Sequence, residues 1–77
     1  MLSVRREKFI KFAGNSLLDD SVVYAEIDVD TADELPEIYG ISGRILHQGS
    51  TALIIKEGRI AILSGDGHWY INGEMIK

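Results

Sequence analysis

The sequence predicts a small, mainly β domain, and three observations lead to this fold class. Apolar and polar residues alternate over residues 21–29, as in a half-buried strand. Residues 51–71 contain three short apolar segments separated by glycine-bearing turns. The one helix signal, at residues 31–34, is cut short by Pro36. We therefore expect a small antiparallel β-meander or barrel-like sheet with at most one or two short helical turns, and residues 1–77 as a single domain.

The first expected element covers residues 4–12 and is extended. Ile10 and Phe12 alternate with Lys11, although Phe9, Ile10 and Phe12 would also crowd one side of a helix. Turn-forming residues follow at 13–16, and residues 19–21 close a loop.

The second expected strand, residues 21–29, has one buried face and one solvated face. Thr31 and Glu34 then fit a capping box, which Pro36 limits to a single helical turn. Residues 39–43 are expected to form a loop, and residues 44–47 another short strand. The residues expected on the buried face are Val23, Ala25, Ile27 and Val29.

The C-terminal meander can be given a register. If Glu57 and Gly58 form a two-residue turn, Ile55 pairs with Ile60. A three-residue loop at 65–67 then places Leu63 beside Trp69. One face shows Leu53, Ile55, Ile60, Ile62 and Tyr70, and the other shows Ala52, Ile54, Ala61, Leu63, Trp69 and Ile71. Both faces are apolar, which a solvated antiparallel sheet would avoid.

The two apolar faces and the short chain together predict assembly. A chain of 77 residues buries only about 60–65% of its unfolded surface. It has no cysteine, so neither disulfides nor thiolate-bound metals can supplement the core. We therefore expect a homo-oligomer. The residues expected in the core or at the interface are Leu53, Ile55, Ile60, Ile62, Trp69 and Tyr70.

Charge is distributed unevenly around the net value of −4. Residues 1–12 carry four basic side chains against Glu7, whereas residues 13–43 carry only acidic ones. The two regions are either solvated surfaces or contacts between the basic arm of one subunit and the acidic region of another. The expected acidic surface consists of Asp19, Asp20, Asp28, Asp30, Asp33, Glu34 and Glu37.

Candidate catalytic and metal-binding patterns are weak. Residues 28–33 hold alternating carboxylates but depart from the EF-hand pattern at Ala32 and Asp33. His47 and His68 lack paired ligand spacing. Ser64, Asp66 and His68 lie near one another, but at an exposed hairpin tip. We therefore expect no enzyme, cofactor, metal or small-molecule substrate.

Targeting signals and nucleic-acid binding are also not expected. The longest apolar runs contain four residues, against roughly 18 for a membrane span, and no apolar segment of secretory length follows the basic N-terminus. Four basic residues in an acidic chain are too few for a nucleic-acid footprint.

Several short motifs combine into a resemblance. They are Lys11-Phe-Ala-Gly-Asn-Ser16, Leu35-Pro36, Gly49-Ser50-Thr-Ala52, Glu57-Gly58-Arg-Ile-Ala-Ile-Leu63 and Gly65-Asp66-Gly67-His-Trp69. The combination resembles small structural and accessory proteins of tailed phages and prophages. The resemblance implies an oligomeric, non-enzymatic virion component encoded among head, connector and tail genes, present in the host cytoplasm before assembly. The chain departs from fibre-type proteins because it has no long repeat or coiled-coil stem.

The leading expectation is thus a phage or prophage structural protein that associates with itself, and with other virion proteins, through its β-sheet. The alternative is a small acidic binding or regulatory module that contacts a host protein through the acidic surface.

Overall fold

The computed structural model describes residues 1–12, 21–41 and 44–77, and it confirms the mainly β fold class. The first expected element, residues 4–12, is extended rather than helical, and the observed strand covers Ser3–Phe12. The described elements are strands β1 (Ser3–Phe12), β2 (Ser21–Val29), β3 (Ile45–Leu46), β4 (Thr51–Ile54), β5 (Arg59–Leu63), β6 (Trp69–Ile71) and β7 (Glu74–Met75), with one 3-10 helix, η1 (Ala32–Glu34). No helix among the described residues is long and apolar enough to cross a membrane.

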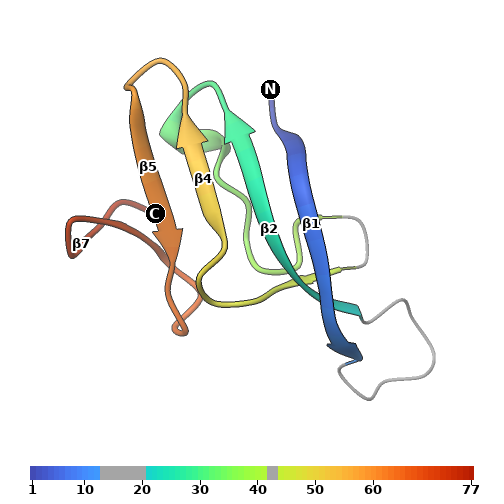
Figure 1. The fold of residues 1–77 in the computed structure, drawn as a ribbon. Helices are drawn as coiled ribbons and strands as arrows, with labels where there is room; N and C mark the ends of the chain where they lie inside the picture. The colour runs from blue at the N-terminus through green and yellow to red at the C-terminus, as the bar shows by residue number, and fades with distance from the viewer. Residues whose placement is uncertain (13–20, 42–43) are drawn as a thin grey trace.

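The strands form one sheet in the order β1-β2-β4-β5-β6-β7, with β3 also paired to β2 (Figure 1). Strands β4 to β7 are a meander of antiparallel pairs, and β1 is antiparallel to β2. Strand β2 instead runs parallel to both β3 and β4. The sheet is therefore mixed. After β2 ends, the chain returns to the beginning of β2, where β3 pairs with Val22 and Val23, and β4 then runs in the same direction as β2.

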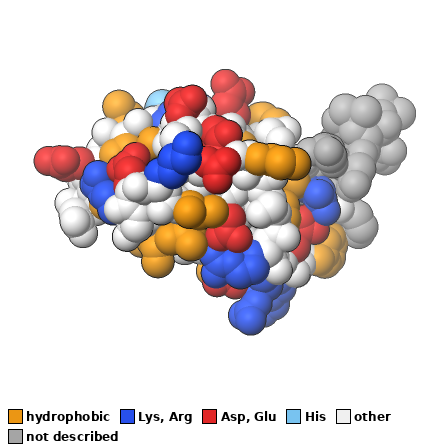
Figure 2. Space-filling model, turned by 90° about the horizontal axis from the view of Figure 1, so that it is seen from above, with side chains coloured by type: hydrophobic (Ala, Val, Ile, Leu, Met, Phe, Trp, Pro, Cys, Tyr) orange, Lys and Arg blue, Asp and Glu red, His pale blue; other side chains and the backbone are white. Residues whose placement is uncertain are grey.

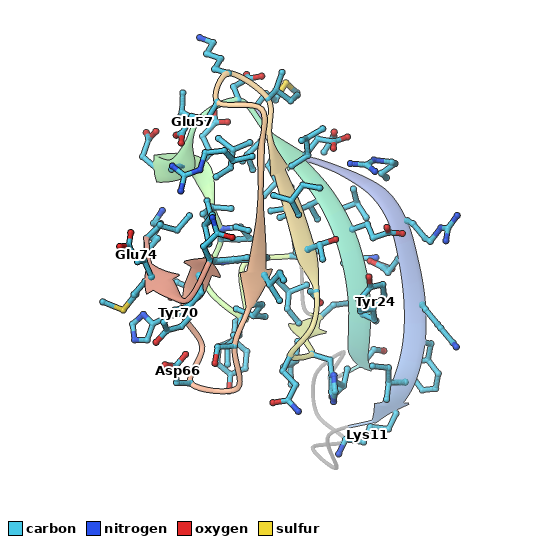
Figure 3. The ribbon with its side chains drawn as sticks, turned by 60° about the vertical axis from the view of Figure 1, so that its left-hand side comes forward. Lys11, Tyr24, Glu57, Asp66, Tyr70 and Glu74 are labelled. Atoms are coloured by element: carbon cyan, nitrogen blue, oxygen red, sulfur yellow. The ribbon has the colours of Figure 1, made fainter. Side chains whose placement is uncertain are left out.

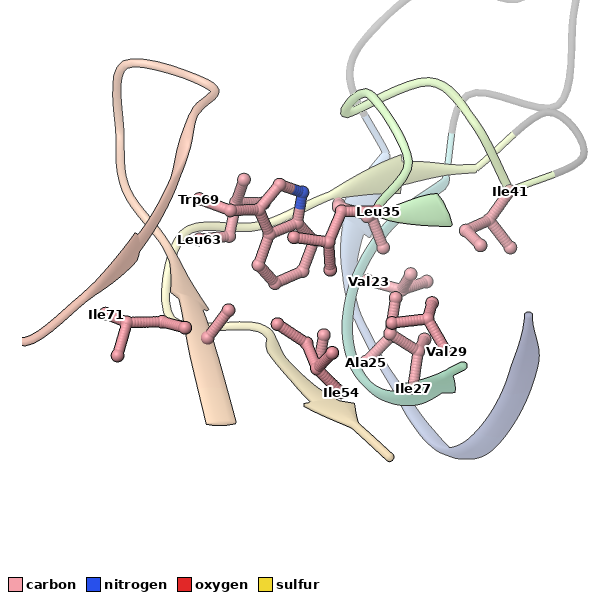
Figure 4. Close-up of a cluster of buried hydrophobic side chains, with 13 residues drawn as sticks. Val23, Ala25, Ile27, Val29, Leu35, Ile41, Ile54, Leu63, Trp69 and Ile71 are labelled. Atoms are coloured by element: carbon pink, nitrogen blue, oxygen red, sulfur yellow. The ribbon is translucent and has the colours of Figure 1, made fainter. Parts of the chain in front are cut away.

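One face of the sheet carries the core, and a covering segment of residues 30–41 and 44–47 lies over it. The predicted alternation in β2 is confirmed: Val23, Ala25, Ile27 and Val29 are buried, while the residues between them are half-buried. Trp69 and Leu35 meet at the centre of the core (Figure 4). The Trp69 Nε1–H donates a hydrogen bond to the carbonyl of Pro36 at 2.8 Å, which satisfies the buried indole and ties the covering segment to β6.

A buried serine joins β3 to β4 along the edge of β2. Strand β3 pairs with Val22 and Val23, and β4 pairs with β2 only from Glu26 onward. In the gap, the Ser50 hydroxyl accepts a hydrogen bond from the Ala25 N–H at 3.1 Å and donates one to the carbonyl of His47 at 2.8 Å. The side chain thus replaces the main-chain carbonyl that a continuous strand would offer to Ala25.

The predicted register of the first hairpin is wrong by two residues. Ile54 pairs with Arg59, so the turn contains four residues, 55–58, instead of the two expected. A two-residue type I′ turn needs φ above zero at both positions, and only Gly58 adopts it (φ 64°). A shift of two residues preserves the faces, so the predicted division of side chains still holds. The second pairing, Leu63 with Trp69, is confirmed.

The structure adds strand β7, which the sequence analysis did not predict. Asn72 and Gly73 both have positive φ, 51° and 83°, and connect Ile71 to its partner Glu74. This Asn-Gly pair is the signal that could have revealed the hairpin.

The single helical turn is confirmed as η1, but Thr31 makes no side-chain cap bond, and the hydrogen bond that the Glu34 carboxylate accepts comes from the residue before the N-cap. The Glu34 carboxylate reaches back to accept a hydrogen bond from the Asp30 N–H at 2.7 Å. The Thr31 side chain makes no cap bond, because its hydroxyl donates to the Asp33 carboxylate.

Candidate interaction surface

The face of the sheet that points away from the core, here called the outer face, divides into two halves. Paired residues share a face, so one row of side chains crosses the whole sheet from Arg6 through Glu26, Thr51 and Ile62 to Tyr70. A second row runs from Asp28 through Leu53 to Ile60. The apolar half consists of Leu53, Ile60, Ile62, Tyr70 and Met75, and the charged half consists of Arg5, Arg6, Lys8, Glu26 and Asp28.

The apolar half leaves large side chains in contact with solvent. Ile60 is 59% exposed and Ile62 52% exposed, both on the regular strand β5. Met75 is exposed, and Leu53 and Tyr70 are half-buried. A shallow depression of about 490 Å³ lies beside them, lined by Ile62, Ser64, Tyr70, Asn72 and Gly73. Hydrophobic side chains lie between acidic and basic ones on the surface seen from above (Figure 2).

The six residues predicted for the core or interface separate between the two faces. Trp69 is 1% exposed and belongs to the core. Leu53, Ile60, Ile62 and Tyr70 lie on the outer face, as their register requires. Ile55 follows β4 within the turn and is exposed.

Two ion pairs form inside the charged half of the same chain. The Arg5 guanidinium binds the Asp28 carboxylate across the β1/β2 pair, and the Arg6 Nε lies 3.3 Å from the Glu26 carboxylate. Both pairs join the basic arm to acidic residues of the same chain. The intersubunit contact considered from the sequence is therefore not needed to pair these charges.

Most of the predicted acidic surface also has partners inside the chain. The amino terminus of Met1 contacts Asp30 and Glu34, and hydrogen bonding to it is the main cause that lowers the pKa of both carboxyls. The Thr31 hydroxyl lowers the pKa of Asp33. Among the described residues, the Glu37 side chain makes no hydrogen bond or ion pair. Asp19 and Asp20 lie outside the described residues.

The Ser64, Asp66 and His68 side chains do not form a catalytic arrangement. The Asp66 carboxylate accepts hydrogen bonds from the Tyr70 hydroxyl at 2.6 Å and from the His68 backbone N–H at 3.0 Å (Figure 3). The Tyr70 bond is the main cause that lowers the pKa of Asp66, and the same bond raises the pKa of Tyr70. The His68 Nδ1 lies 3.3 Å from the carbonyl of Lys77. Asp66 thus holds the turn beside the apolar half and does not orient the imidazole.

Titratable side chains also line the other two depressions. One, of about 410 Å³, lies where the covering segment meets β6, and its lining includes Glu37, Tyr39, Asp66, His68 and Lys77 beside Trp69. Another, of about 330 Å³, includes His47 and Gln48. Within the part of the chain that the structure describes, no group of three or more metal-ligating side chains comes together.

Comparison of the chain with family models, with curated proteins and with solved structures finds no match. The resemblance to phage proteins therefore depends on the short motifs alone, and the structure gives several of these a structural role. Gly49 has φ 91°, which favours glycine, at the switch between β3 and β4. Ser50 bridges that switch, and Ala52 and Trp69 are buried in the core.

Proposed function

We propose that this chain is a non-enzymatic structural or accessory protein that associates with itself through the outer face of its sheet. The observation that carries this proposal is the exposure of Ile60 and Ile62 at the centre of a regular sheet face. Burying an isoleucine completely is worth about 1.5–3 kcal/mol, so two half-exposed side chains leave roughly 2 kcal/mol available to an interface. An apolar patch of a few hundred Å² is within the range of the largest patch on an ordinary monomer, and such patches are often functional.

The phage or prophage setting is part of the same proposal and depends on the motif resemblance. Small virion components act by assembling, so a sheet with a buried inner face and an apolar outer half suits that role. The alternative, an acidic regulatory module, has less support, because Asp28, Asp30, Asp33 and Glu34 already have partners within the chain.

The test is the molar mass of the wild-type chain in solution, measured by sedimentation equilibrium from low micromolar to near-millimolar concentration. The proposal expects the mass to rise above 8.6 kDa as concentration increases. A folded monomer over the whole range would contradict it. The phage setting has a separate test: the gene should lie among capsid, connector or tail genes, and a location among unrelated metabolic genes would count against it.

A further inference from the structure

We infer that the partner of the outer face is a second copy of this chain, stacked apolar half on apolar half about a twofold axis, with the two charged halves projecting on opposite sides. This inference depends on the proposed function, and it adds which surface is used and how the copies overlap. Among the described strands, three parts of the sheet have no neighbouring strand or layer: the outer edge of β1, the outer edge of β7, which is only two residues long, and the outer face.

The free edge of β1 is poorly suited to pairing with its own copy. In an antiparallel pair about a twofold axis, the residue on the axis lies opposite itself. The centre of β1 is Arg6-Glu7-Lys8, so each central register places like charges directly opposite one another, which destabilises a pair. Irregularities between Val4 and Arg6 and between Phe9 and Lys11 also interrupt the regular edge.

The outer face is suited to a copy of itself. A twofold interface brings the same surface from both subunits together, so an apolar half always finds an apolar half. The Arg5–Asp28 and Arg6–Glu26 pairs balance each other's charge within one chain, and so they do not call for a charged partner.

The extent of the overlap follows from the cost of burying charges. Stacking the complete outer faces would remove two ion pairs per chain from water, and this desolvation opposes association. Stacking only the apolar halves leaves these pairs at the solvated rim. With four strands about 4.8 Å apart and the five residues of β5 rising about 3.3 Å each, the footprint is roughly 320 Å². A standard stable interface needs about 800 Å² of accessible surface per partner, so the dimer is expected to be weak and to dissociate on dilution.

The test compares two matched variants, Ile62→Lys on the outer face and Ile10→Lys on the β1 edge. Both side chains are exposed, 52% and 40%, so neither substitution empties the core. Circular dichroism checks that each variant is folded. If Ile62→Lys does not fold, Ile60→Thr, which keeps a β-branched side chain, replaces it as the outer-face variant. We expect Ile62→Lys to weaken self-association at least tenfold and Ile10→Lys to leave it within about twofold of wild type, by sedimentation equilibrium. Added salt should not weaken wild-type association, because the contact is apolar.

Single cysteines in this cysteine-free chain test the overlap. The Ile62→Cys thiol should become protected from a thiol-alkylating reagent as the dimer forms, whereas the Tyr24→Cys thiol, on the outer face beyond the apolar half, should stay reactive. Protection of both thiols would overturn the half overlap in favour of complete stacking. An oligomer that Ile10→Lys dissociates, or that neither variant weakens, would overturn the outer-face contact while leaving the proposed self-association intact. A wild-type chain that stays monomeric would overturn both.

Discussion

Removing the hydroxyl of Ser50 should destabilise the fold more than its size suggests. Ser50 and Ala25 are both fully buried, and the Ala25 N–H has the Ser50 hydroxyl as its acceptor. In Ser50→Ala this donor would be left without a partner. The His47 carbonyl would keep its bond from the Ser50 N–H at 3.1 Å, so one orphaned group remains.

An unsatisfied buried donor costs about 1–3 kcal/mol, so we expect a loss of about 2 kcal/mol in the free energy of unfolding. For 77 residues the total is on the order of 4–12 kcal/mol, so this loss is a sizeable fraction. Urea denaturation at one low protein concentration measures it. The midpoint should fall by about 1–2 M with an unchanged slope.

The matched control is Thr51→Val, which also removes a hydroxyl and keeps the β-branched shape. The Thr51 hydroxyl makes no hydrogen bond to any described residue, so the change should stay within about 0.5 kcal/mol. If Ser50→Ala cost no more than the control, the role assigned to Ser50 at the strand switch would be refuted.

Three further predictions concern the buried indole of Trp69, the backbone at Gly49 and the Tyr70–Asp66 hydrogen bond. Trp69→Phe removes the donor to the Pro36 carbonyl and should lower the free energy of unfolding by about 1–3 kcal/mol by circular dichroism, and a loss below about 0.5 kcal/mol would show that this tether is unimportant. In Gly49→Ala the added methyl meets open space, but the alanine must adopt φ 91°. We therefore expect the free energy of unfolding, measured by urea denaturation, to fall by about 1–2 kcal/mol, and an unchanged value would contradict this strain. The Tyr70–Asp66 bond raises the pKa of Tyr70, so its stabilisation is complete below the ordinary tyrosine pKa of about 10 and is lost as pH rises through the raised value. The lowered pKa of Asp66 means that its contribution is present above the ordinary carboxyl pKa of about 3.9 and is lost as pH falls through the lowered value. Ultraviolet absorbance titration, with Tyr70→Phe to identify the signal, should give a tyrosine pKa that returns toward its ordinary value in Asp66→Asn, and an unchanged titration would exclude the bond.

Much of the fold was predictable, because neighbouring residues determine which side of a strand each side chain occupies. The alternation in β2 identified its buried face, and Trp69 and Tyr70 were placed on opposite sides of the sheet. The faces of β4 and β5 were right despite the wrong register, since a shift of two residues conserves them. Both apolar faces were therefore visible in the sequence, and the outer one became the candidate surface.

The pairings between distant segments were not predictable in the same way. Strand β4 joins β2 in parallel only after the covering segment has crossed the inner face, and the spacing of apolar residues along the chain does not predict this pairing. The role of Ser50 depends on the same pairing. Its hydroxyl accepts the hydrogen bond from the Ala25 N–H because β3 ends and β4 begins beside Ala25.

The sequence by itself determined the strand class, the single helical turn, the two apolar faces and the separation of basic from acidic residues, since each depends on neighbouring side chains and backbone preferences. Only the tertiary structure decided that Arg5 and Arg6 meet Asp28 and Glu26 of their own chain, and that the charges lie on one half of the outer face. The physical reason is that strands distant in the chain lie about 4.8 Å apart once paired, so contacts across the sheet are set by pairing and not by sequence distance.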